Sequence, residues 1–140
     1  MERREGWEHW FAEFLFKRKD TPFEYGTNDC CLFVCDAVER MTGVDPAVDY
    51  RGKYSTKREA FDLIDWDIEG HMGDLFKTYG MTENGINHAG RGDVALVNGP
   101  MGDALGVIDM TGERVALPAK TGLMFFPKDK DTVKKTWRVG

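Results

Sequence analysis

The sequence lacks the features that mark several large classes of protein. No apolar run approaches the ~20 residues that a membrane-crossing helix requires, so we expect no membrane span. Asp and Glu number 24 against 19 Lys and Arg, a net charge of −5. Nucleic-acid-binding domains usually carry a basic surface, so we expect no nucleic-acid partner. The first five residues lack the apolar stretch of a secretory signal, which predicts synthesis in a cytoplasm and departure only within a larger assembly.

Histidine and cysteine are also scarce, with three of each in 140 residues. The cysteines, Cys30, Cys31 and Cys35, fall within six residues, and an odd number in so tight a cluster argues against a disulfide framework. Their Cys-Cys-x3-Cys spacing differs from that of a zinc knuckle, so we expect neither a metal nor another cofactor. The cluster is therefore interpreted as buried packing or as a nucleophile with its neighbours.

What remains is the composition of one globular domain. Hydrophobic residues make up 41%, charged residues 31% and aromatic residues 12% of the chain, enough apolar side chains for one core. No repeat or linker divides the sequence. We therefore expect a single domain over residues 1–140.

The hydrophobic period changes along the chain from helical to strand-like. Helices are expected at residues 1–20, 29–41, 56–67 and 71–79, a loop at 80–92, and strands at 93–97, 104–110, 114–117, 122–127 and 132–139. Because helices precede strands that are joined by short turns, the predicted class is α+β with an antiparallel β-meander. The second helix is apolar on all sides over residues 30–35, so we expect it to be the buried centre of the fold.

A cysteine opens this buried helix, in the segment Tyr25-Gly26-Thr27-Asn28-Asp29-Cys30. A thiol at a helix N-terminus feels the positive end of the helix dipole, which lowers its pKa toward the reactive range. Asp29 opposes this effect unless its carboxylate caps the helix. Position alone leaves Cys30 open as a candidate nucleophile or as a packed side chain, whereas Cys31 and Cys35 are expected in the core.

A nucleophilic cysteine normally needs a base, most often a histidine. His9 is expected on the surface of the first helix, and His71 at a helix start. His88, just before the first strand of the expected meander, is a candidate base only if the loop that carries it folds over the cysteine.

Two motifs resemble the NlpC-type, papain-like cysteine peptidases. Tyr25-Gly26-x2-Asp29-Cys30 is similar to the Asp-Cys signature that opens their central helix, and Gly92-Asp93-Val94 to their first core strand. The chain is more specifically similar, over about residues 22–139, to small proteins encoded among the tail genes of tailed phages and prophages. Further matching segments are Thr42-Gly43-x-Asp45, Arg51-Gly52-x-Tyr54, Ala104-Leu105-Gly106-Val107, Gly122-Leu123 and Trp137-Arg138-Val139. The resemblance implies a papain-like single domain.

The sequence departs from the peptidase pattern at the base. The resemblance implies a catalytic histidine at the start of the second core strand, and Ala104 occupies that position. A papain-like cysteine without its base loses most of its activation. We therefore expect a phage-tail component, located in the virion at or near the tail tip, with a degraded active site. The alternatives are an active cysteine peptidase or peptidoglycan hydrolase acting on the host cell wall, and an assembly chaperone absent from the finished particle.

A tail component acts by docking on other tail proteins, and two regions have the composition of an interface. The loop around residues 50–54 combines aromatic and cationic side chains, a mixture common at interface hot spots. The first helix carries more aromatic surface than a small domain needs, so it is a candidate docking element. The candidate interface residues are Trp7, Trp10, Phe14, Tyr50, Arg51 and Tyr54. The Lys-rich segment from Lys128 to Arg138 is a further candidate for an acidic partner.

Overall fold

The computed structural model describes all 140 residues and contains four helices and one six-stranded antiparallel sheet. The helices are α1 (Trp7–Arg18), α2 (Cys30–Thr42), α3 (Lys57–Leu63) and α4 (Ile68–Thr78). The strands are β1 (Thr82–Asn84), β2 (Val94–Gly99), β3 (Gly102–Ile108), β4 (Arg114–Ala119), β5 (Gly122–Pro127) and β6 (Val133–Arg138), and a short 3-10 helix, η1 (Ile86–His88), follows β1. The expected α+β class is confirmed. No helix combines the length and the apolar character needed to cross a bilayer.

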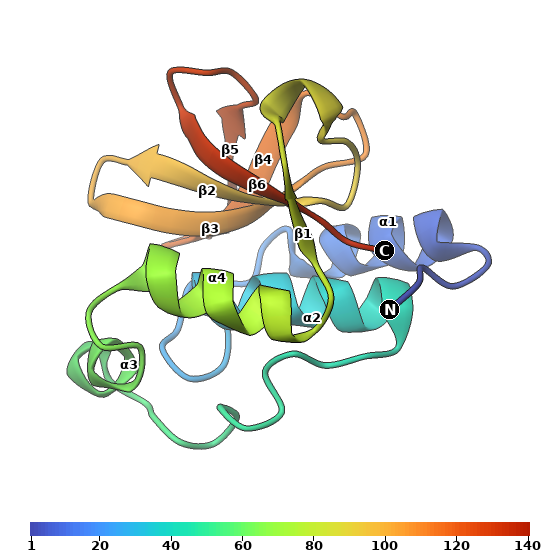
Figure 1. The fold of residues 1–140 in the computed structure, drawn as a ribbon. Coiled ribbons are helices and arrows are strands. Elements are labelled where there is room, and N and C mark those ends of the chain that lie inside the picture. Colours follow the sequence, from blue (N-terminus) through green and yellow to red (C-terminus); the bar gives the residue numbers. More distant parts are fainter.

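The sheet is not the simple meander that the sequence predicted. Strands β2 to β5 do follow one another as neighbours, but the full order is β1-β6-β2-β3-β4-β5. Strand β6 therefore returns across the molecule and pairs between β1 and β2 (Figure 1). The predicted loop at residues 80–92 contains β1 and η1. The short strand β1 forms by pairing with β6, a partner that is distant in the sequence.

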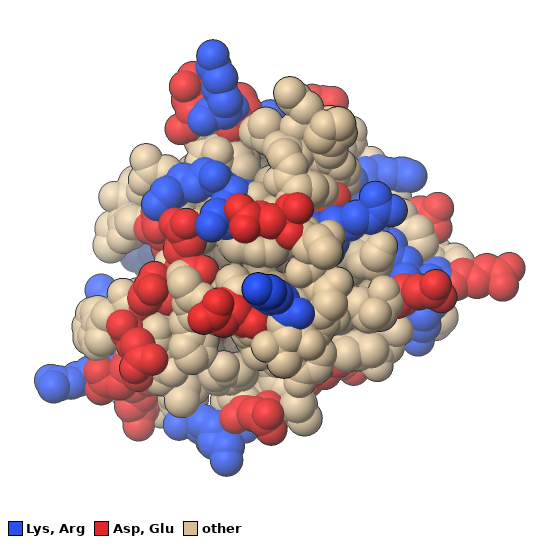
Figure 2. Space-filling model, viewed as in Figure 1, with Lys and Arg blue, Asp and Glu red and all other residues tan.

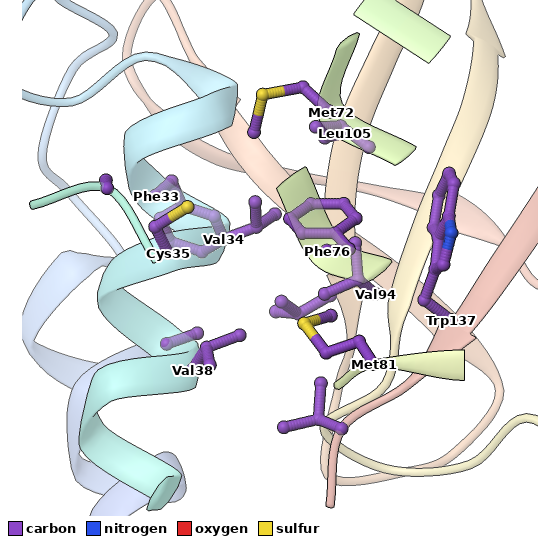
Figure 3. Close-up of a cluster of buried hydrophobic side chains, with 14 of the residues drawn as sticks. Phe33, Val34, Cys35, Val38, Met72, Phe76, Met81, Val94, Leu105 and Trp137 are labelled. Carbon is purple, nitrogen blue, oxygen red and sulfur yellow. The ribbon is translucent and has the colours of Figure 1, made fainter. Parts of the chain in front are cut away.

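Helix α2 is the centre of the core, as its apolar sequence predicts. Seven of its 13 residues are buried: Leu32, Phe33, Val34, Cys35, Ala37, Val38 and Met41. In Figure 3, side chains from α2 meet Phe76 of α4 and Val94 of β2. Alternation along the strands puts Leu105 and Val107 on the same face of the sheet. The helices α1, α2 and α4 thus lie along one face of the sheet (Figure 1).

A second, smaller apolar cluster lies on the other face. It contains the alternate strand residues Ala95, Val97, Ile108 and Val115. Partly buried side chains from η1 and β5 pack against it, including Ile86 and Phe126. The short helix η1 and side chains of the edge strand β5 therefore cover part of this face, and none of the four α-helices contributes to the cluster.

Helix α1 belongs to the core, which corrects the expectation that Phe14 lies on a docking surface. Phe14 is 3% exposed and its ring lies 5.2 Å from that of Phe33. Phe11 is fully buried beside it. The exposed aromatic side chains of α1 are Trp10 and Phe16, and Trp7 is half-buried beneath the Arg3 guanidinium.

The third helix is shorter than predicted. It ends at Leu63, and Asp65 and Trp66 both have φ of 56°. Two consecutive left-handed residues cannot continue a right-handed helix. Trp66 is consequently 61% exposed, and its ring lies 4.9 Å from that of Phe61.

Replacing Phe14 with Ala is expected to lower the free energy of unfolding by about 3–5 kcal/mol, because a buried aromatic ring leaves a cavity. Phe16, two residues along the same helix and 66% exposed, is the matched control, and Phe16→Ala is expected to cost less than about 0.5 kcal/mol. Urea unfolding followed by circular dichroism measures both. Equal effects of the two substitutions would show that α1 is not part of the cooperative core.

Candidate functional site

A cavity of about 640 Å³ opens beside the N-terminus of α2. Of the 30 residues that line it, 22 are hydrophobic. The wall is built from α2, α3, α4, the turn between β2 and β3, and the turn between β4 and β5. Volume and apolar character are those of a site for a small ligand.

The cavity exists because β3 and β4 diverge. Strand β3 begins at Gly102, but only Val107 and Ile108 pair with β4. At this end the strands approach closely, since a Cβ on Gly106 would lie 2.6 Å from the Ala116 carbonyl oxygen. The other ends separate, and residues 99–104 face residues 117–120 across the opening.

Asp29 sets the geometry of the cavity floor. It is 4% exposed, and its Oδ1 accepts a hydrogen bond of 2.9 Å from the Leu32 N–H, which caps α2. Its Oδ2 accepts from the Gly26 N–H at 2.9 Å and from the Tyr54 hydroxyl at 2.5 Å. Burial, followed by this hydrogen bond, raises the pKa of Tyr54. Asp29 therefore caps α2, the condition that the sequence left open.

Gly26 is required for this arrangement. Its φ is +88°, and a Cβ there would lie 2.3 Å from the Tyr54 carbonyl oxygen. The glycine of the Tyr25-Gly26 segment therefore lets residues 23–28 and the loop around Tyr54 pack against each other.

Cys30, the first residue of α2, is half-buried and lines the cavity. A hydrogen bond from the Cys31 thiol is the main cause that lowers the pKa of Cys30, against the opposing effects of burial and Asp29. A backbone hydrogen bond from Leu105 also lowers it. The same thiol pair raises the pKa of Cys31, and burial raises that of Cys35. Cys30 is therefore the only one of the three thiols whose pKa shift favours the thiolate.

The structure provides no histidine beside Cys30. No histidine lines the cavity, and Ala104 does. His88, the candidate base, is exposed on η1, which packs beside the apolar cluster on the other face of the sheet, so that expectation is wrong. The Nε2 of His71 lies 2.7 Å from the Tyr50 hydroxyl, and exposed His9 lies 3.5 Å from Glu13.

Asp103, next to Ala104, is not a free base either. Its carboxylate lies 2.9 Å from the Lys134 ammonium. Lys134 and its neighbour Lys135 also pair with Glu69 on α4. The C-terminal lysines thus have carboxylate partners, and Figure 2 shows basic and acidic side chains intermixed on the face in view. A surplus of positive charge for an acidic partner is not found at these two lysines.

The loop residues that were predicted as interface candidates point inward. Tyr54 bonds Asp29, and Tyr50 bonds His71. Arg51 pairs with Asp36 at 2.6 Å and with Asp45 at 2.8 Å, and the Asp45 contact is the main cause that raises the pKa of Arg51. These three side chains hold the loop against α2 and the cavity wall, a role that the sequence analysis did not predict. The Arg51-Gly52-x-Tyr54 segment, one of the segments that match the phage-tail proteins, was the sequence feature that could have indicated this role.

No group of three or more His, Cys, Asp or Glu side chains is arranged to hold a metal ion. The cavity lining combines the Cys30 thiol, the Tyr50 and Tyr54 hydroxyls and a wall of apolar side chains with four charged residues, Asp29, Lys57, Asp103 and Lys120.

A family model described as a domain of unknown function, DUF6950, matches residues 2–139. The chain belongs to this family. The match includes α1, so the family's domain extends over the N-terminal helix as well as the cavity. No curated protein matches the sequence.

Cys30 is expected to react with iodoacetamide faster than Cys31 and Cys35 in the native protein. All three cysteines line the cavity, but the pKa of Cys30 is lowered, whereas the pKa values of Cys31 and Cys35 are raised. Its rate is expected to rise with pH at lower values than for an unperturbed thiol. Mass-spectrometric mapping after short exposure measures all three sites. Equal protection of the three thiols would mean that Cys30 is merely packed.

Proposed function

We propose that this protein is a component of a tailed-phage tail, at or near its tip, with a papain-like fold and a degraded cysteine-peptidase site. The observation that carries the proposal is an accessible thiol of lowered pKa in a cavity without a histidine. The motifs around Cys30 and Ala104 support the peptidase-like relationship. The wider resemblance over residues 22–139 supports the assignment to phage tails.

The surroundings of Cys30 support the first half of a cysteine-peptidase mechanism, in which the thiol loses its proton and attacks the substrate. Cys30 and Ala104 both line the cavity, and the backbone of Leu105, the residue after Ala104, forms a hydrogen bond that lowers the pKa of the Cys30 thiol. In a cysteine peptidase the base takes up this position to receive the thiol proton. The methyl group of Ala104 can neither accept that proton nor donate it later.

Amide hydrolysis also requires a proton for the departing amine. Asp103 forms an ion pair with Lys134, and the Tyr54 hydroxyl donates its hydrogen bond to Asp29. Neither group is free to serve as a general acid at neutral pH. The thiol can attack, but nothing beside it assists bond cleavage, which favours a binding role for the cavity.

The alternative function is an active cysteine peptidase or peptidoglycan hydrolase acting on the host wall. The lowered pKa of Cys30 favours it, since part of the activation of the nucleophile is present without a base. The two functions differ in whether the isolated protein turns over substrate.

The purified protein is expected to release no soluble peptide from peptidoglycan above background, because Ala104 supplies no base. The restorative variant is Ala104→His, with Ala104→Gln as the control of similar polarity and no basic nitrogen. Activity in Ala104→His that disappears in Ala104→His/Cys30→Ala would support the hypothesis of a peptidase-like site that lacks only its base. Wild-type activity abolished by Cys30→Ala would instead establish the alternative.

The tail assignment predicts that the chain is present in purified phage particles in a fixed ratio to other tail proteins. Quantitative mass spectrometry of purified particles, and of tails separated from heads, measures this ratio. A chain present in infected-cell lysates but absent from both preparations would be an assembly chaperone or an unrelated protein, and the assignment to the tail would be wrong.

A further inference from the structure

The polar side chains that line the cavity are largely occupied by other groups of the protein. The Asp29 carboxylate accepts three hydrogen bonds, one of them from Tyr54. The hydroxyl of Tyr50 bonds His71, and Asp103 pairs with Lys134. Few side-chain hydrogen-bonding groups therefore remain for a ligand, so the buried part of a ligand must itself be apolar.

Two lysines on the cavity wall have no ion-pair partner, although the whole chain is negative; Asp29, the lining carboxylate without an ion pair, is buried and accepts three hydrogen bonds. Lys57, at the start of α3, and Lys120, in the turn after β4, both line the cavity and are exposed. Neither forms an ion pair, whereas the lining carboxylate of Asp103 is neutralised by Lys134. A ligand that complements this site carries a negative charge at the mouth and an apolar body inside.

We propose that the cavity binds a single-chain anionic amphiphile, an unbranched aliphatic carboxylate. Its chain lies among apolar side chains from α3, α4 and β5, such as Ile64, Met72 and Met124. Its carboxylate lies at the mouth, in the positive field of Lys57 and Lys120. The volume of about 640 Å³ fits one such ligand.

The polar inventory favours this ligand over a peptide or a sugar. Each residue of an extended peptide brings an N–H and a C=O that need partners, and each sugar ring brings several hydroxyls. An alkyl chain brings none. The inference goes beyond the proposed function, because it concerns binding and requires no turnover at Cys30.

Calorimetric titration of the wild-type protein with decanoate and dodecanoate, each below its micelle-forming concentration, tests the proposal. Burying one methylene is worth about 0.8 kcal/mol, which is about a fourfold gain in affinity. Dodecanoate is therefore expected to bind about 15-fold more tightly than decanoate, at one molecule per chain. Ionic adsorption to surface lysines would give no dependence on chain length, and that result would overturn the proposal.

The head group is tested with dodecanol, which has the same chain without the charge, and with variants. Lys57→Ala and Lys120→Ala are each expected to weaken dodecanoate binding by about two- to fivefold and to leave dodecanol binding unchanged. Lys53→Ala is the matched control, since Lys53 is exposed and does not line the cavity. Equal losses in Lys53→Ala, or no preference for dodecanoate over dodecanol, would contradict the anionic assignment.

Occupancy of the cavity is tested at Cys30. Saturating dodecanoate is expected to slow iodoacetamide labelling of Cys30 at least fivefold, while Cys30→Ala still binds. Ala60→Trp, on the cavity side of α3, is expected to weaken binding at least tenfold by filling the space, with an unchanged melting transition. Unprotected Cys30 at saturation would place the ligand elsewhere. Tight binding of an apolar peptide that competes with dodecanoate without depending on Lys57 and Lys120 would show that the cavity binds peptides instead. Either result would overturn the proposal.

Discussion

The buried carboxylate of Asp29 is the interaction on which the site depends. A buried charge is costly unless hydrogen bonds satisfy it, and Asp29 receives three, from the Gly26 N–H, the Leu32 N–H and the Tyr54 hydroxyl. These donors belong to three segments: the turn before α2, α2 itself and the loop before α3. One side chain thus sets where α2 begins, and so where the first thiol of the helix lies.

The position of α2 then determines the sheet around it. Because α2 is buried on one side against β3, the divergence of β3 from β4 leaves a space directly beside the helix start. On the outer side of α2, Asp36 forms ion pairs with both Arg51 of the loop and Arg18 of α1. A single buried helix is therefore tied to the first helix, the loop and the sheet, and the cavity is what these contacts leave open.

Much of the fold has a local signature in the sequence. The start of α2 follows from Asp29 and its end from Gly43, and β5 occupies the predicted residues 122–127, an apolar run between a glycine and a proline. The pairing of β6 between β1 and β2 has no local signature, because the paired residues are 36 to 56 positions apart in the sequence. Likewise, Tyr50, Arg51 and Tyr54 have the composition of an interface. Only the positions of Asp29, Asp36 and Asp45 in space show that they turn inward.

The lowered pKa of Cys30 does not by itself separate an active from a degraded site. Its causes are a neighbouring thiol and a backbone N–H, both of which follow from a helix that starts at this point beside β3. Neither depends on a catalytic base, so both persist when the base position is Ala104. A methyl group at that position needs no hydrogen-bonding partner, whereas an imidazole would need one for each ring nitrogen. In the proposed degraded site, the alanine at position 104 adds to the apolar wall that 22 of the 30 lining residues form, which favours the proposed binding of an apolar group.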